Sequence, residues 1–310
     1  MTSTALVAPP AVETRVLSLL LPYHRTPGAA SPDPLDHPEQ LRQIRKFTRA
    51  GEPVVFTLPG FPCKSPNPAK VLGHLPDEGE RLSLAFLDRL CARIAEIYPP
   101  GARMLICSDG HVFADLIQVS DAHIDAYGDE LRAMIRRAGL AHLDTFDLRA
   151  VHGDLPYDTK RALVTEEFAP ALAELRAQAR TDEETARLYR GITRFLVEDT
   201  ADFHGSRSAL QRQCRERAYG VIARSRAWGE LIASCHPETV RLSIHPQSPG
   251  AAKFGIRLLD APDAWATPWH TAVLREADGR ARLIRRADAE RVGRLVFREG
   301  RPSHFVALGG

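Results

Sequence analysis

Apolar positions in the first half of the chain alternate between helical and strand-like spacing. Residues 39–49 and 80–98 carry apolar side chains three and four positions apart, which is the period of one helix face. Residues 53–58 and 103–107 are short apolar runs typical of buried strands. A further helix is predicted over residues 121–138. Strands alternating with helices in this way are typical of an α/β fold, and this order resembles half of a doubly wound sheet.

The second half of the chain changes character twice. A short strand is predicted at residues 143–148, a polar loop at 151–158, and long helical patterns from about 159 to 236. From about residue 237 to 305, apolar runs are separated by turns that contain proline or glycine, which predicts a β-rich section. Strands are expected there at residues 240–244, 254–259, 270–274 and 282–285.

The N-terminal residues 1–38 are expected to form a flexible or peripheral arm, with one domain over residues 39–310. A helical pattern at residues 11–21 is interrupted by a run rich in proline, glycine and alanine. The first ten residues lack the cationic and apolar segments of a signal peptide. No apolar run approaches the roughly 20 residues of a membrane helix. We therefore expect a cytoplasmic protein that does not enter a membrane.

Composition excludes several classes of function. The formal net charge of +2 is too small to predict a nucleic-acid partner, although small anionic ligands remain open. The five cysteines are odd in number and form no CxxC pair, so neither a disulfide framework nor a zinc ribbon is indicated. Neither GxGxxG nor GxxxxGK[ST] occurs, so nothing supports a bound dinucleotide or nucleoside triphosphate.

The loop at residues 61–73 is the first candidate site. It follows the predicted strand at 53–58, and α/β proteins bind ligands at the carboxyl ends of their strands. Its prolines restrict the backbone and reduce the entropy lost on ordering. Lys64, Ser65 and Lys70 are candidates for binding a phosphate or a carboxylate. Lys64 could alternatively form a Schiff base with a carbonyl substrate.

Carboxylates and imidazoles supply candidates for acid/base chemistry. Asp109 and Asp115 flank a loop after the strand at 103–107, where a carboxylate can act as a base or bind a substrate; a turn-forming Asp-Gly explains Asp109 equally well. Arg241, Ser243 and His245 would share one face of the strand at 240–244. That face could also be simply solvent-exposed.

Two further patterns carry candidate residues. Trp269 and His270 follow Pro268. In one interpretation the His270 imidazole lies beside an aromatic surface, and in the other Trp269 belongs to the hydrophobic core. Arginines cluster at 207–226, mostly as a solvated face, yet Arg224 or Arg226 aimed inward would suit a phosphate.

A different class of enzyme remains an alternative. His152 and Asp154, with His245 or His270, match the ligand pattern of non-haem Fe(II)/2-oxoglutarate oxygenases. That fold requires a largely β chain, whereas the middle of this chain is helical.

Several of these stretches together resemble the pyoverdine/dityrosine biosynthesis family, whose characterised members are isocyanide (isonitrile) synthases. The resemblance runs in order from about residue 40 to 305. Cys63 stands where the family has another small or apolar residue. We therefore do not expect its thiol to be catalytic. The matching stretches are Phe61-Pro-Cys-Lys-Ser-Pro-Asn67, Lys70-Val-Leu-Gly73, Leu75-Pro-Asp77 with Gly79-Glu80, Ser108-Asp-Gly-His-Val-Phe113 with Asp115, Arg224-Ser-Arg-Ala-Trp228, Val240-Arg-Leu-Ser-Ile-His-Pro-Gln247 and Thr267-Pro-Trp-His270.

The resemblance implies a Rossmann-like core with a mixed sheet, and a reaction without metal or nucleotide cofactor. The α-amine of an amino acid, usually tyrosine or tryptophan, becomes an isocyanide whose carbon comes from C2 of ribulose 5-phosphate, in secondary metabolism. A separate Fe(II)/2-oxoglutarate oxygenase would then act downstream. A non-catalytic sugar-phosphate-binding relative is a further alternative.

On this interpretation the candidate residues divide into two groups. Lys64, Asp109, His245 and His270 are the catalytic candidates. The substrate-binding candidates are Ser65, Lys70, Asp115, Arg224, Arg226, Arg241, Ser243 and Trp269.

Overall fold

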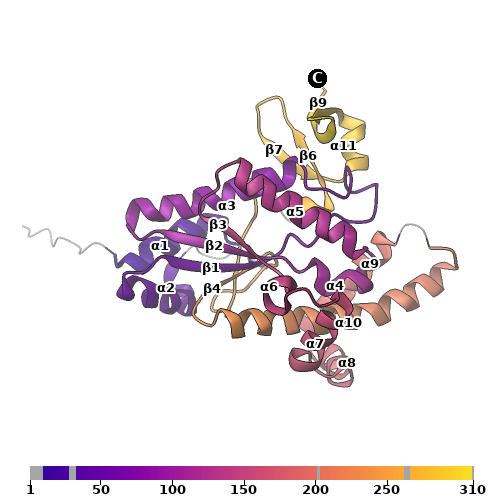
Figure 1. Ribbon diagram of the computed structural model, residues 1–310, viewed down its shortest axis with the longest axis horizontal. Coiled ribbons are helices and arrows are strands. Elements are labelled where there is room, and N and C mark those ends of the chain that lie inside the picture. The colour runs from indigo at the N-terminus through magenta and orange to yellow at the C-terminus, as the bar shows by residue number, and fades with distance from the viewer. Residues whose placement is uncertain (1–9, 28–32, 201–202, 262–265, 309–310) are drawn as a thin grey trace, which may run out of the picture.

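A five-stranded parallel sheet with helices on both faces forms the centre of the protein (Figure 1). The computed structural model describes residues 10–27, 33–200, 203–261 and 266–308. In spatial order the strands are β3 (Leu143–Phe146), β2 (Ala102–Cys107), β1 (Val54–Pro59), β4 (Val240–Ser243) and β5 (Phe254–Gly255). The chain moves outward from β1 to β3 and then returns to the other side of β1. The carboxyl ends of β1 and β4 therefore border the topological switch point, where such sheets bind ligands.

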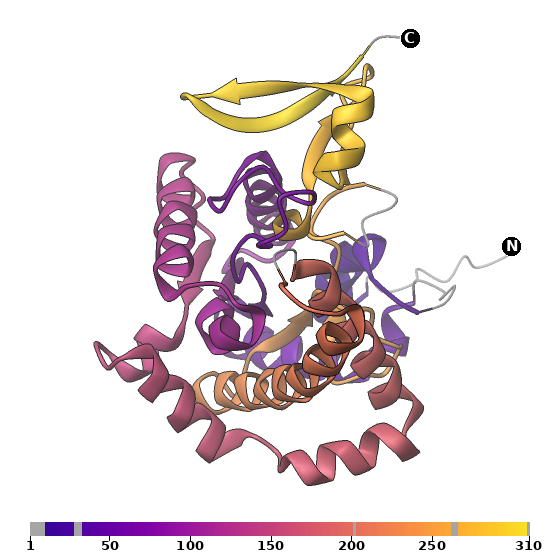
Figure 2. The same cartoon turned by 90° about the vertical axis from the view of Figure 1, so that its right-hand side faces the viewer.

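One face of the sheet is covered by helices from the middle of the chain. The long helix α10 (Arg207–Cys235) lies against the sheet, where the Trp228 indole donates a hydrogen bond to the Cys107 carbonyl at 3.4 Å. Figure 2 shows α7, α8 and α9 as an outer arc around α10. The other helices of this region are α4 (Gly110–Ile117), α6 (Leu148–His152), α7 (Tyr157–Phe168), α8 (Leu172–Thr181) and α9 (Glu183–Asp199).

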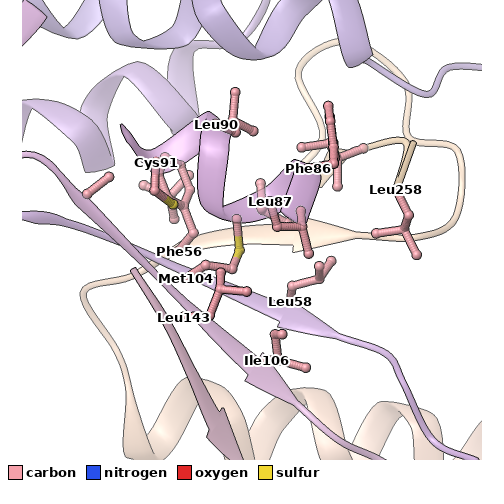
Figure 3. Close-up of a cluster of buried hydrophobic side chains, with 14 of the residues drawn as sticks. Phe56, Leu58, Phe86, Leu87, Leu90, Cys91, Met104, Ile106, Leu143 and Leu258 are labelled. Atoms are coloured by element: carbon pink, nitrogen blue, oxygen red, sulfur yellow. The ribbon is translucent and has the colours of Figure 1, made fainter. Parts of the chain in front are cut away.

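The opposite face carries the main hydrophobic core (Figure 3). Alternation along β1 directs Phe56 and Leu58 to this face, where they pack with Leu87 of α3. Burying each such side chain contributes about 1.5–3 kcal/mol to folding. The helices that supply this core are α1 (Val12–Leu20), α2 (Pro38–Ala50), α3 (Glu78–Ile97) and α5 (Asp121–Arg137).

A second, four-stranded mixed sheet lies above the loop that follows β1 (Figures 1 and 2). Its order is β7 (Ala281–Ile284), β6 (Ala272–Arg275), β9 (Arg301–Ala307) and β8 (Gly293–Arg298), and α11 (Arg286–Val292) packs beside it. The amide nitrogens of Arg286 and Ala287 donate hydrogen bonds to the carbonyls of Lys70 and Ala69 at 3.1 and 3.0 Å. The second sheet is thereby joined to the loop.

The α/β class, the helical middle section and the β-rich last quarter are confirmed. The mixed sheet is the smaller one, whereas every pairing of the central sheet is parallel. Short 3₁₀ turns add to these elements at Leu21–Tyr23, Pro34–Asp36 and Pro268–His270.

Some expectations differ from the structure. Val12–Leu20 is not a peripheral arm, because Val16 and Leu17 are fully buried in the main core; residues 1–9 and 28–32 of that arm lie outside the described residues. The predicted loop after β2 is helical from Gly110, and that at 151–158 begins inside α6. Strands β8 and β9 were not predicted individually. No helix in the described parts of the chain is long and apolar enough to cross a membrane.

Candidate active site

The loop of residues 60–77 crosses the switch point and is fixed at both sides (Figure 2). Phe61 adopts a left-handed backbone with φ of 55°, and its ring packs 5.1 Å from that of Trp269. The Ser65 amide donates a hydrogen bond to the Trp269 carbonyl at 2.8 Å. On the other side, a Cβ at Gly110 would lie 2.1 Å from the Pro62 carbonyl oxygen, so only glycine fits there. The loop is therefore held between the start of α4 and residues 267–270.

Lys64 lies inside a buried ion-pair network below this loop. Its Nζ is 2.8 Å from Asp77 Oδ2, 2.8 Å from Glu80 Oε2 and 2.9 Å from the Pro268 carbonyl oxygen. These three partners match the three donors of an ammonium group, and the Lys64 side chain is 0% exposed. The two carboxylates hold the pKa of Lys64 above its ordinary value against the opposing effect of burial. This arrangement differs from the predicted direct contact of Lys64 with substrate.

Ser65 and Lys70 connect the loop to the end of α9. The Ser65 hydroxyl donates to Asp199 Oδ2 at 2.9 Å, and the Lys70 ammonium donates to Asp199 Oδ1. Lys70 also lies 3.2 Å from Glu198 Oε2 and 5.4 Å from the ring centroid of Phe195. The Asp199 carboxylate is almost fully buried, so its partners offset a desolvation cost of several kcal/mol. These contacts fix α9 against the loop.

Asp109 occupies the carboxyl end of β2 and directly precedes α4. Its Oδ1 atom is buried, and no residue in the described parts of the chain forms a hydrogen bond with it. Burial raises the pKa of Asp109 to about 7, so the carboxyl group exchanges a proton near neutral pH. Asp109 and Asp199 both raise the pKa of the Cys63 thiol, adding to the larger effect of burial. Cys63 therefore lies near both carboxylates as a neutral thiol.

The two predicted imidazoles approach the same loop. Burial, reinforced by Lys70, Lys64 and His245, lowers the pKa of His270 to about 3, so this imidazole is neutral and accepts protons poorly from water. Thr267 Oγ1 lies 2.9 Å from His270 Nδ1. The other ring nitrogen, Nε2, can therefore form a hydrogen bond with a ligand.

His245 lies just beyond the end of β4. Its side chain is exposed, and desolvation by neighbouring protein, with Arg25 and Lys253 adding to the effect, lowers its pKa. His245, His270, Asp109 and the loop thus gather acid/base groups of different pKa at the switch point.

The alternative metal triad is not assembled. Among residues 10–27, 33–200, 203–261 and 266–308, no group of three or more His, Cys, Asp and Glu side chains is placed to hold a metal ion. His152 and Asp154 lie at the end of α6, and do not form such a group with His245 or His270.

Comparison with known proteins identifies the family. The family model described as "Pyoverdine/dityrosine biosynthesis protein" matches residues 44–296. The chain belongs to this family.

Members of the pyoverdine/dityrosine biosynthesis family include several close relatives of this chain. An L-tyrosine isonitrile synthase from Pseudomonas aeruginosa is 45% identical, over 96% of this chain and 95% of that protein. An L-tryptophan isonitrile synthase from Fischerella ambigua is 40% identical, over 86% of this chain and 81% of that protein. The crystal structure of PvcA from Pseudomonas aeruginosa superposes with a TM-score of 0.90 at 44% identity, covering 96% of this chain and all of that chain.

Other predicted residues of this family member have partners within the fold. Arg224 makes two hydrogen bonds to the Asp115 carboxylate, and a third to the Val112 carbonyl, which joins α10 to α4. Arg226 donates to Gln178 Oε1 at 2.7 Å between α10 and α8. Trp269 is 2% exposed and belongs to the main core. These contacts favour the structural interpretation of all four predicted residues: Asp115, Arg224, Arg226 and Trp269.

The predicted face of β4 is only partly preserved. Ser243 is buried, and its Oγ accepts a hydrogen bond from the His245 amide at 3.0 Å. His245 lies beyond the end of β4, so it does not share the predicted strand face. Arg241 points toward α10 and donates to the Gly229 carbonyl at 3.0 Å.

Sequence reasoning missed the acidic partners of the loop and one lysine. Glu80 and Asp199 belong to helical patterns that gave no sign of a buried carboxylate; only the match to Gly79-Glu80 in the resemblance pointed at the first. Lys253 precedes a short strand in a polar turn, and its place beside Arg241 follows only from the pairing of β4 with β5.

Proposed function

We propose that this protein is an isonitrile synthase that converts the α-amino group of an aromatic amino acid, tyrosine in particular, to an isonitrile. The observation that carries this proposal is 45% identity with an L-tyrosine isonitrile synthase over nearly the full length of both chains. The site supports it, because a carboxyl group and two imidazoles lie close to the loop that follows β1. Amine chemistry needs such groups to move protons.

As carbon donor we propose ribulose 5-phosphate. The amine nitrogen would form a bond to the C2 carbonyl carbon, and the carbonyl oxygen would take a proton to give a carbinolamine. Loss of that oxygen as water, with a second proton, gives the imine. Asp109, with a pKa of about 7, both donates and accepts protons at neutral pH and suits these two steps. The neutral His270 would accept a hydrogen bond from the attacking amine and orient its nitrogen toward the C2 carbonyl carbon.

The lysines of the loop have a supporting role in this proposal. Lys64 is a positioning residue, because its three donors hold Asp77, Glu80 and the turn at Pro268. Lys70 and Ser65 fix α9 through Asp199. The loop thereby sets the position of His270, which follows Pro268 by two residues.

An isotope experiment tests the proposal. Purified protein is incubated with ribulose 5-phosphate carrying ¹³C at C2 and either L-tyrosine or L-tryptophan. The product is trapped with a tetrazine, and its mass is measured by mass spectrometry. We expect a labelled isonitrile from L-tyrosine. His270→Gln should lower turnover by about 100-fold or more. Arg226→Gln, which removes a cation that contacts Gln178 of α8, serves as control and should retain activity.

The outcomes separate the alternatives. Absence of isonitrile from every amino acid would refute the proposal, and ribulose 5-phosphate binding without product would identify a non-catalytic relative. An unlabelled isonitrile would keep the activity and exclude the carbon donor. Consumption of 2-oxoglutarate that depends on Fe(II) would favour the oxygenase class instead.

A further inference from the structure

Two cations lie side by side between β4, β5 and α10. β4 and β5 pair in parallel with Leu242 opposite Phe254 and Ser243 opposite Gly255. The same register continues to Arg241 and Lys253, so both side chains extend toward α10. Both are half-buried. Their terminal nitrogens converge on the helix: Arg241 Nη2 and Lys253 Nζ would lie 3.5 and 3.7 Å from a Cβ placed on Gly229.

This pair has no ion-pair partner among the described residues. None of the described acidic residues lies within ion-pair distance of Arg241 or Lys253. Burial, followed by the charge of Arg241, lowers the pKa of Lys253, and the opposing effect of Glu230 is smaller. Like charges on neighbouring strands repel each other and destabilise the sheet. An anion that bridges the two nitrogens would remove this cost.

Gly229 faces the two cations. It is a buried helical glycine, and its lack of a side chain leaves the position beside Arg241 Nη2 and Lys253 Nζ open. A glycine within a helix disfavours the helix relative to alanine. The added methyl group would make only ordinary contacts with Arg241 and Lys253. Protein packing therefore does not require glycine here, whereas a ligand in this space would.

The cation pair lies near the acid/base groups at the carboxyl end of β4. The charge of Lys253 contributes to the lowered pKa of His245, which places the lysine within electrostatic range of that imidazole. Arg241 precedes His245 by four positions in the sequence, so the end of β4 brings the two residues near each other. An extended substrate could thus reach from the acid/base groups to the two cations.

We propose that Arg241 and Lys253, facing Gly229, form the subsite for the phosphate group of a sugar phosphate. A phosphate monoester carries a charge of about −1.5 to −2 at pH 7, which matches two cations, whereas an amino-acid carboxylate would leave one cation unbalanced. Arginine offers two parallel donors to phosphate oxygens, and lysine adds a point charge. This inference rests on the proposed function, because it assigns the site of its carbon donor.

Binding measurements test the subsite without relying on turnover. Calorimetric titrations would use ribulose 5-phosphate, inorganic phosphate and L-tyrosine separately, at low and high salt. Lys253→Met should weaken the binding of both phosphate ligands by about 10-fold or more and reduce its salt dependence. The affinity for L-tyrosine should remain unchanged. Lys46→Met is the matched control, because it removes an equal charge from an exposed ion pair with Glu238.

Gly229→Ala supplies a variant whose fold is not at risk. We expect unchanged or increased stability together with weaker phosphate binding. Gly191→Ala, at an exposed helical glycine with open space around it, controls for the general effect of alanine in a helix. Unchanged phosphate affinity in Lys253→Met and Gly229→Ala, or a loss confined to L-tyrosine, would overturn the inference while leaving the proposed activity standing. Loss of phosphate binding in a chain that forms no isonitrile would instead support the subsite and refute the proposed activity.

Discussion

Replacing Lys64 by alanine tests whether this lysine supports the fold or contacts substrate. The substitution removes the ammonium group that lies between Asp77 and Glu80, and both carboxyl groups remain buried, with side chains 4% and 0% exposed. Removing one partner of a buried ion pair costs about 3–5 kcal/mol, because a charge is left uncompensated.

The remaining hydrogen bonds place the expected loss near the lower end, about 3 kcal/mol. Glu80 keeps the Tyr127 hydroxyl at 3.1 Å and the Asp77 amide at 2.9 Å as donors, and Asp77 keeps the Gly79 amide at 2.8 Å. Burial already raises the pKa of Asp77 to about 7 with Lys64 present, so without the lysine the Asp77 carboxyl group should take up a proton more readily. A raised carboxyl pKa means that the native state binds more protons than the unfolded state. The deficit should therefore be largest above pH 7 and shrink as pH falls.

Urea unfolding of Lys64→Ala and of the parent protein at pH 5.5 and pH 8 would measure this effect. Lys46→Ala is the control, since its exposed pair with Glu238 contributes at most about 1 kcal/mol. A Lys64→Ala protein with the parent's free energy of unfolding at both pH values, yet without activity, would contradict this reasoning. That result would mean that the lysine contacts substrate directly.

Three further substitutions or reagents probe the site. Asp109→Asn should lower kcat/KM by about 100-fold or more, and the pH–rate profile should lose the step near pH 7 that Asp109 produces, where activity rises as the carboxyl group is deprotonated; an unchanged profile would exclude this residue. Gly110→Ala should inactivate and destabilise the protein, because its Cβ would overlap the Pro62 carbonyl oxygen at 2.1 Å; a fully active variant would show that the loop moves freely. In the native protein, a maleimide should label the exposed Cys235 and leave Cys63 unmodified, because Cys63 is buried and its thiol pKa is raised; labelling of Cys63, detected by peptide mapping, would contradict the buried position.

Periodicity allowed the sheet and its main helices to be predicted. The apolar runs at β1 and β2 are short and continuous, which predicts strands buried within a sheet. The apolar positions of α3 form one continuous face that packs against these strands. The helical pattern of Val12–Leu20 is followed by a proline-rich run, which predicts a peripheral arm, and this prediction is wrong. A short amphipathic helix gives no indication of the core that it joins, because that core is made by residues distant in sequence.

The sequence indicates a candidate loop after β1 but not the partners of the side chains in that loop. A lysine at the exit of a buried strand is typical of both a ligand contact and a structural ion pair. The deciding fact is that Asp77 and Glu80 begin α3 and turn their carboxylates back toward Lys64. In the same way, the contact of Arg224 with Asp115 depends on how α10 packs on α4. Local spacing contains no information about such long-range partners.

The charges around the switch point explain why the chemistry is divided among distant segments. Lys64 and Lys70 are neutralised by carboxylates, and their charges add to the effect of burial that keeps the His270 imidazole unprotonated. Burial raises the pKa of Asp109 toward neutrality. No acidic residue in the described parts of the chain forms an ion pair with Arg241 or Lys253, so both remain available to an anion. A loop that contacted substrate through its own lysines would lose the first of these effects, because the lysines could not also hold the imidazole and the start of α3 in place.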